Sequence, residues 1–274
     1  MRVVVLLAAL FITVLSSSAA AAPSPPGSND FTCEPSPARP TPVVLVHGTF
    51  ANQTTMSAIS SALKADGYCV FSLDYGGYAL GPALGIYGTG FIERSARQLD
   101  AFVDRVVSAT GATSVSIVGH SQGGMMPRYF IKYLGGQVDD LVGLVPSNHG
   151  TTFNGLFTLA SFFPGANELL VGSLCPACAQ QARGSRFITD LNAGDETPGG
   201  TSYTVVASRY DEVVTPYTSS FLAGANTTNI TLQDKCPAKL TEHLAIIFDR
   251  SAIQLVRNAL GRAGPADPAY QPAC

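Results

Sequence analysis

The sequence predicts an α/β fold in which helices cover both faces of a mostly parallel central sheet, all within a single domain. Segments with strand character alternate with segments whose apolar residues recur at helical spacing, a pattern typical of parallel sheets. The first strand segment, 43–46, is a short, continuous run of β-branched and other apolar residues, which indicates a strand buried on both faces. About 250 residues follow an N-terminal export segment, which is long enough for one such domain with a full hydrophobic core.

Six strands and four helices account for most of this pattern. The expected strands are 43–46, 68–73, 114–118, 141–145, 203–207 and a weaker one at 229–232. The expected helices are 57–64, 91–107, 122–134 and 244–260, and Gly111 follows the second of them as a C-terminal cap. Two stretches, 74–90 and 150–172, fit neither period. Both follow strands, on the sheet edge where α/β proteins bind ligands.

The N-terminus has the pattern of a secretory signal peptide. A positive start is followed by an apolar run over 3–15 and by small residues over 16–22. The apolar run is shorter than the roughly 20 residues that a membrane-spanning helix needs. We therefore expect a signal peptide at 1–21, a Pro- and Ser-rich leader at 22–40, and a catalytic domain at 41–274 that is secreted to the extracellular side.

Composition disfavours nucleic acid as a partner. Charged residues make up 13% of the chain, the formal net charge is −3, and the basic residues form no run that could neutralise phosphates. The mean hydropathy of +0.22 is high and is compatible with an exposed, lipid-facing surface. No second apolar stretch is long enough to span a membrane, so we expect no integral membrane segment after cleavage.

Six cysteines in an exported chain favour disulfides, although the sequence alone allows many pairings. Cys175 and Cys178 have the spacing of a redox motif, but no thioredoxin-like pattern surrounds them, so we interpret them as a local structural bridge. Cys236 and Cys274 would fix the Pro-rich C-terminal tail, and Cys33 would tie down the leader.

The segment Gly119 to Gly123 matches G-x-S-x-G, the sharp turn between a strand and a helix that exposes a nucleophilic serine. The predicted strand before it and the predicted helix after it supply the context that the motif requires. The two glycines remove side chains that would crowd the turn. Ser121 is therefore the candidate nucleophile.

Hydrolysis of an ester also needs hydrogen-bond donors for the oxyanion. The backbone N–H of Gln122 lies directly after the nucleophile, at the start of a helix. We expect the second donor in the loop after the first strand, at the N–H of Thr49, with that of Phe50 as the alternative. His47 in the same loop is interpreted as a turn residue without a catalytic role.

A serine becomes a nucleophile when a histidine takes its proton and an acid orients that histidine. His243 lies between the last weak strand and the closing helix, where a loop can bring it to Ser121. Asp211 follows the strand at 203–207 and is the candidate acid. His149 is the alternative base, but only Asp139 or Asp140 could then act as its acid.

Three other carboxylates after Ser121 are alternative candidates for the acid. Glu212 has the same chemistry as its neighbour but is expected to point the other way, and Asp190 and Asp195 lie in less defined surroundings. Histidine, cysteine and carboxylate residues show no metal-ligand spacing, and no glycine-rich phosphate loop follows the first strand. The sequence therefore implies no metal and no cofactor.

The sequence resembles the secreted bacterial triacylglycerol lipases of the class 2 lipase family and, more remotely, the small yeast B-type lipases. The resemblance extends over 41–259 and is carried by Val43 to Thr49, Val118 to Gly124, Asn148 to Thr151 and Ser208 to Pro216. It implies the α/β-hydrolase fold, the triad of Ser121, Asp211 and His243, and the oxyanion donors Thr49 and Gln122. It also implies the pairings Cys33–Cys69, Cys175–Cys178 and Cys236–Cys274.

The leading functional hypothesis is hydrolysis of carboxylic esters, acylglycerols included, with a lipid–water interface as a candidate place of action. Apolar residues between 153 and 174 can line a site for an acyl chain. The alternative enzyme is a short-chain carboxylesterase or polyester hydrolase with the same triad and a shallower cleft. A hypothesis from another class is an inactive hydrolase fold that only binds ligands, and the presence of all three triad residue types in chain order argues against it.

Overall fold

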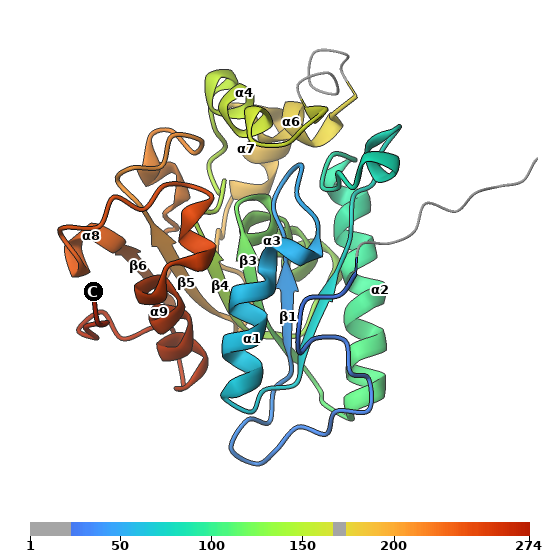
Figure 1. Cartoon of the computed structure of the whole chain (residues 1–274), viewed down its shortest axis with the longest axis vertical. Coiled ribbons are helices and arrows are strands. Elements are labelled where there is room, and N and C mark those ends of the chain that lie inside the picture. Colours follow the sequence, from blue (N-terminus) through green and yellow to red (C-terminus); the bar gives the residue numbers. More distant parts are fainter. Residues whose placement is uncertain (1–22, 167–173) are drawn as a thin grey trace, which may run out of the picture.

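A six-stranded parallel sheet forms the centre of the protein, as the sequence predicts (Figure 1). The computed structural model describes residues 23–166 and 174–274, so the predicted signal peptide lies outside the described residues. The strand order is β2-β1-β3-β4-β5-β6. The strands are β1 (Val43–Val46), β2 (Val70–Leu73), β3 (Val115–His120), β4 (Val138–Leu144), β5 (Ser202–Ala207) and β6 (Thr227–Thr231).

Helices cover both faces of this sheet. One face packs against α1 (Ser57–Ala65) and α9 (Arg250–Leu260), and the other packs against α2 (Ile92–Thr110) and α3 (Gln122–Leu134). Helices α4 (Phe153–Ser161), α6 (Pro176–Gln181) and α7 (Arg186–Asn192) lie beyond the carboxyl ends of the strands (Figure 1). The short helices are η1 (Gln53–Met56), η2 (Gly81–Leu84), η3 (Tyr217–Ser220), α8 (Leu232–Lys235) and η4 (Ala245–Phe248).

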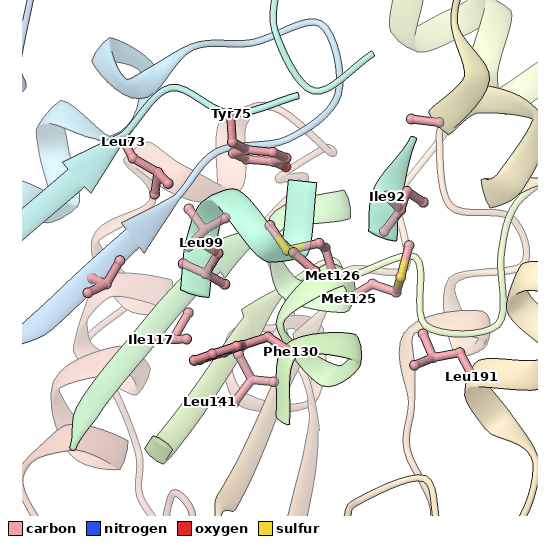
Figure 2. Packing of buried hydrophobic residues seen from close by; sticks show 14 of the residues in the cluster. Leu73, Tyr75, Ile92, Leu99, Ile117, Met125, Met126, Phe130, Leu141 and Leu191 are labelled. Atoms are coloured by element: carbon pink, nitrogen blue, oxygen red, sulfur yellow. The ribbon is translucent and has the colours of Figure 1, made fainter. Parts of the chain in front are cut away.

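Alternate residues of each central strand enter two separate cores. In β1, Val44 and Val46 join the α2 and α3 side, whereas Val43 and Leu45 join the α1 and α9 side. Figure 2 shows the first core, where Met126 and Phe130 of α3 approach the strands. All four β1 side chains are fully buried, which is why the strand is a continuous apolar run.

The strand order reverses direction between β1 and β3. From β1 the chain moves outward to β2, and from β3 it moves to the opposite side through β4, β5 and β6. Val46 at the end of β1 is paired with Gly119 near the end of β3. The loops after these two strands therefore meet at a topological switch point, where open α/β sheets bind their ligands.

The leader contacts the outer edge of the sheet. Asn29 donates its backbone N–H to Val70 of β2, and its side-chain oxygen accepts the N–H of Ser72. Three disulfides join Cys33 to Cys69, Cys175 to Cys178 and Cys236 to Cys274, and this is the pairing that the family resemblance implies. No helix within residues 23–166 and 174–274 is long and apolar enough to cross a membrane.

The structure corrects four predicted elements. Strand β4 begins at Val138, before the expected 141, and β6 covers 227–231 and gives way to α8 at Leu232. The stretch 150–172 was expected to fit neither period, but it contains helix α4. The single helix expected over 244–260 is divided into η4 and α9, with Asp249 between them.

Asp249 explains this division because its carboxylate accepts hydrogen bonds both from the start of α9 and from the segment before His243. One oxygen caps α9 by accepting the N–H groups of Ser251 and Ala252, at 2.8 and 3.2 Å. The other accepts from Lys239 Nζ at 3.0 Å and from Thr241 Oγ1 at 2.7 Å. Burial raises the pKa of Asp249, but these hydrogen bonds outweigh it and hold the pKa below its ordinary value. The cap thus fixes the segment that leads to His243.

Replacement of Asp249 by alanine should lower the free energy of unfolding by about 2 kcal/mol at neutral pH, because the helix cap and the buried contacts are lost together. The lowered pKa of Asp249 means that the folded protein stabilises its carboxylate relative to the unfolded chain. This contribution is therefore present above the ordinary pKa of 3.8 and is lost as the pH falls through the lower folded value.

Urea denaturation at neutral pH and in acid measures both effects. Asp249→Asn is the matched control, because it keeps an oxygen for the cap and loses only the charge. A difference between Asp249→Ala and the unmodified protein that grows in acid would contradict this assignment.

Candidate active site

Ser121 lies in the sharp turn between β3 and α3, with φ 55° and ψ −123°. Residues other than glycine rarely adopt a positive φ, so the backbone is strained at Ser121. A Cβ at Gly119 would lie 1.9 Å from the carbonyl oxygen of Gly123, and a Cβ at Gly123 would lie 2.2 Å from that of Val46. The two glycines of G-x-S-x-G are therefore required by backbone contacts within the turn and with β1.

The loop after β1 lies directly against this turn. A Cβ at Gly48 would lie only 3.0 Å from the Ser121 Cβ, so any larger residue would push the loop and the turn apart. Phe50, two residues later, takes φ 63° and turns the loop sharply after Thr49. Thr49 is thereby held next to the turn that carries Ser121, and Gln122 of that turn contacts its hydroxyl.

The Thr49 hydroxyl accepts two hydrogen bonds from side-chain amides. Gln122 Nε2 donates to Thr49 Oγ1 at 2.7 Å and Gln181 Nε2 donates at 2.8 Å. The Gln122 amide is oriented by a second hydrogen bond, from its Nε2 to the carbonyl of Gly88 at 2.8 Å. A hydroxyl oxygen has two acceptor sites, so both are occupied and the hydroxyl hydrogen remains to be donated.

Asp211 and His243 form the second half of the site. His243 Nδ1 lies 2.9 Å from Asp211 Oδ1 and 3.0 Å from Oδ2, and both side chains are fully buried. Asp211 Oδ1 also accepts the backbone N–H groups of Val213 and Val214, which fix the carboxylate. His243 Nε2 is buried and has no hydrogen-bond partner within residues 23–166 and 174–274.

The other candidate base and acids have partners elsewhere. His149 Nε2 lies 3.0 Å from Glu196, and the His149 backbone N–H donates to Ser219. Asp190 pairs with Arg186 on the surface, while Asp195 accepts the N–H of a neighbouring residue, Thr197. His149, Asp190 and Asp195 are therefore interpreted as residues that hold their own loops and helices in place.

Glu212 does not point away from the site, contrary to the sequence-based expectation. Its Oε2 accepts the backbone N–H of His243 at 3.3 Å. The contact is to the main chain, whereas the imidazole is bound by Asp211. The two adjacent carboxylates therefore hold different parts of the same histidine.

Two further histidines are buried beside this site. Burial is the largest effect on both, and it lowers the pKa of His47 to about 4 and that of His120 to about 3. Attraction by Asp74 partly offsets the shift at His47, whereas proximity to His243 adds to the shift at His120. Both rings are consequently neutral at physiological pH, and His47 is held in its turn by a contact of 2.8 Å with the Gly48 carbonyl.

Apolar side chains from α4 and the residues after it lie beyond the carboxyl ends of the strands. Leu156 and Leu159 are buried in the core, whereas Phe157 and Phe162 are exposed. The ring of Phe163 lies 6.4 Å from that of Phe50 in the loop beside Ser121. Part of the predicted apolar segment, 167–173, lies outside the described residues.

Sequence reasoning missed three residues of this site: His120, Gln181 and Glu212 as a contact of His243. His120 occupies a variable position of the G-x-S-x-G motif, and Gln181 is distant in sequence from the residues it contacts. In the sequence, Gln181 is marked only by its place shortly after the Cys175–Cys178 pair. In the described part of the chain, no three potential metal ligands form a cluster.

Comparison with known proteins agrees with this arrangement of motifs. The model of the family described as "Lipase (class 2)" matches residues 40–256. A triacylglycerol lipase of Pseudarthrobacter phenanthrenivorans is 39% identical over 94 residues, which cover 32% of this chain and 27% of that protein. A triacylglycerol lipase of Vibrio cholerae is 32% identical over 114 residues, covering 40% and 32%. The chain thus matches about a quarter to a third of the length of these curated relatives.

Solved structures establish the fold class. Lipase B of Aspergillus fumigatus superimposes with a TM-score of 0.69 at 20% identity, over 90% of this chain and 57% of that one. The mature form of a Bacillus licheniformis lipase gives a TM-score of 0.56 at 16% identity, over 78% and 89%. The fold is therefore that of the α/β-hydrolases. With the family model matching most of its length, the chain belongs to the class 2 lipase family.

Proposed function

We propose that this protein is a secreted serine ester hydrolase of the lipase type, with Ser121 as nucleophile, His243 as base and Asp211 as acid. The observation that carries the proposal is the combination of a strained Ser121 with a buried Asp211–His243 pair at the same edge of the sheet. The similarity to the triacylglycerol lipases of Pseudarthrobacter phenanthrenivorans and Vibrio cholerae supports an ester as substrate. The three disulfides, which use all six cysteines, support export.

The first chemical step transfers the Ser121 proton to His243. Asp211 accepts the Nδ1–H, so the neutral imidazole has its free electron pair on Nε2, the atom without a partner. As the proton moves to Nε2, Ser121 Oγ bonds to the ester carbonyl carbon and the carbonyl oxygen becomes an oxyanion. The Asp211 carboxylate stabilises the imidazolium that results.

The oxyanion is bound by donors from two neighbouring loops. The N–H of Gln122 belongs to the first turn of α3, where N–H groups have no acceptor within the helix. We assign the second N–H to Thr49 and add the Thr49 hydroxyl, because its oxygen already accepts two amide hydrogens.

Collapse of the tetrahedral intermediate completes acylation. The imidazolium gives its proton to the leaving alcohol, the ester C–O bond breaks, and the acyl group remains on Ser121. Water then repeats the sequence: its proton passes to His243, its oxygen attacks the acyl carbon, and the carboxylic acid leaves as Ser121 recovers the proton.

Apolar side chains near the proposed nucleophile support the substrate class. The ring of Phe163 lies 6.4 Å from that of Phe50 in the loop beside Ser121, and Phe157 and Phe162 are exposed, which favours an apolar acyl chain over a polar acid. An acylglycerol or another ester with an apolar acyl group is therefore the proposed substrate.

Replacement of Ser121 by alanine should lower the rate of hydrolysis by about three orders of magnitude or more, because only substrate binding and the oxyanion donors remain. Asp211→Asn should also be severe. His243→Ala should leave only a small residual rate, comparable to that of Ser121→Ala, whereas His149→Gln should retain most of the activity. Initial rates on a p-nitrophenyl ester and stoichiometric labelling by a fluorophosphonate measure these effects. Full activity of folded Ser121→Ala would refute the proposed nucleophile.

Removal of the Thr49 hydroxyl tests the oxyanion assignment. Thr49→Val should lower kcat by roughly a hundredfold with little change in KM, because the lost donor acts on the transition state. Thr49→Ser keeps the hydroxyl and is the control, expected to stay close to the unmodified protein. An equal loss in both variants would show that packing, and not the hydroxyl, is responsible.

The acyl-chain preference separates the lipase from the short-chain esterase. We expect kcat/KM to rise from acetate through butyrate to octanoate esters, because each methylene adds buried apolar surface. Emulsified long-chain triacylglycerol should also be hydrolysed. A preference for acetate, with no release of fatty acid from the emulsion, would favour the short-chain carboxylesterase or polyester hydrolase.

A further inference from the structure

We propose that His120, the residue before the nucleophile, is a positioning residue that holds the main chain of His243 in place for catalysis. The inference rests on the proposed function, in which His243 is the base. It assigns a role to a variable position of the G-x-S-x-G motif and adds Glu212 as a second support for the same histidine.

The contact is direct and buried. His120 Nε2 lies 2.9 Å from the backbone carbonyl oxygen of His243. The two rings are tilted by 51° with their centroids 4.9 Å apart, and both residues are buried. A carbonyl oxygen only accepts hydrogen bonds, so Nε2 of His120 must be the protonated ring nitrogen.

His243 needs such support because its own segment has little regular structure. It lies between α8, which ends at Lys235, and η4, which begins at Ala245. No helix or strand ladder fixes its main chain. His120, in contrast, is the last residue of β3 and is paired with Leu144 of β4 in the centre of the sheet. The contact therefore joins an irregular segment to the hydrogen-bonded centre of the sheet.

Three groups of His243 are held in this way. His120 binds the carbonyl, Glu212 accepts the backbone N–H at 3.3 Å, and Asp211 binds Nδ1 at 2.9 Å. Nε2, the atom that exchanges a proton with Ser121, has no hydrogen-bond partner among the described residues. Because His120 and Ser121 are adjacent, the nucleophile and the support of the base share one strand end.

A neutral donor suits this position. Burial, reinforced by proximity to His243, lowers the pKa of His120 to about 3, so the ring carries no charge during turnover. A lysine or arginine at the same site would also donate to the carbonyl. Its positive charge would oppose the imidazolium that forms on His243 during the reaction.

The experiment compares His120→Leu, which lacks a donor, with His120→Gln, whose side-chain amide can place an N–H near the position of Nε2. His120→Leu should lower kcat on an alkyl ester by roughly ten- to a hundredfold, because a misplaced base loses reactive geometry, while KM changes little. The loss should be smaller on a p-nitrophenyl ester, whose leaving group needs no proton from His243. His120→Gln should recover most of the rate.

A double variant tests whether His120 acts through His243. In the His243→Ala background, addition of His120→Leu should not lower the residual rate further, because the group that is positioned has been removed. A further loss there, equal losses on both esters, or failure of His120→Gln to recover the rate would each overturn the proposal. If His120→Leu does not fold, His120→Asn replaces it, because its shorter amide does not reach the carbonyl.

Two controls distinguish this proposal from the proposed function. Hydrolysis by the unmodified protein, lost in Ser121→Ala, establishes the serine mechanism independently of His120. With that result in hand, an unaffected His120→Leu variant overturns only the positioning role. Absence of Ser121-dependent hydrolysis overturns both.

Discussion

The parallel pairing of β1 with β3 is the constraint on which the rest of the site depends. Because Val46 and Gly119 are register partners, the loops that follow them leave the sheet at the same level. Gly48 and Gly123 then allow the two loops to approach more closely than any side chain would permit. The strained conformation of Ser121 persists because this packing over-determines it.

The distant half of the site depends on side-chain hydrogen bonds more than on strand pairing. Asp211 and His243 belong to irregular segments after β5 and β6, and each is fixed by local contacts. Backbone N–H groups hold the Asp211 carboxylate, and Asp249 ties the segment before His243 to the cap of α9. A cap at one helix terminus thus contributes to the placement of the proposed base.

Elements whose pattern reflects their own burial were predictable from sequence. Strand β1 is an apolar run because both faces are covered, and Gly111 ends α2 with φ 68°, as its place in the sequence indicates. The chain order of Ser121, Asp211 and His243 was enough to select three residues, and Asp211 and His243 are in contact. These predictions use information that is local in the sequence.

The predictions that failed required tertiary information. Asp249 lies at helical spacing before the buried residues Ala252, Ile253 and Val256, so a continuous helix would place its carboxylate on the apolar face. Its contacts with Lys239 and Thr241, outside the helix, account for the break. In the sequence, Gly155 indicates an interruption of a helix. In the structure, a Cβ at this position would lie 2.0 Å from the Val213 carbonyl oxygen. Helix α4 therefore needs glycine here to pack on the loop that contains Asp211. The direction of Glu212 likewise depends on where the His243 main chain passes, 31 residues further along the chain. At this site the residue types are encoded locally, whereas their roles are fixed by partners far apart in the sequence.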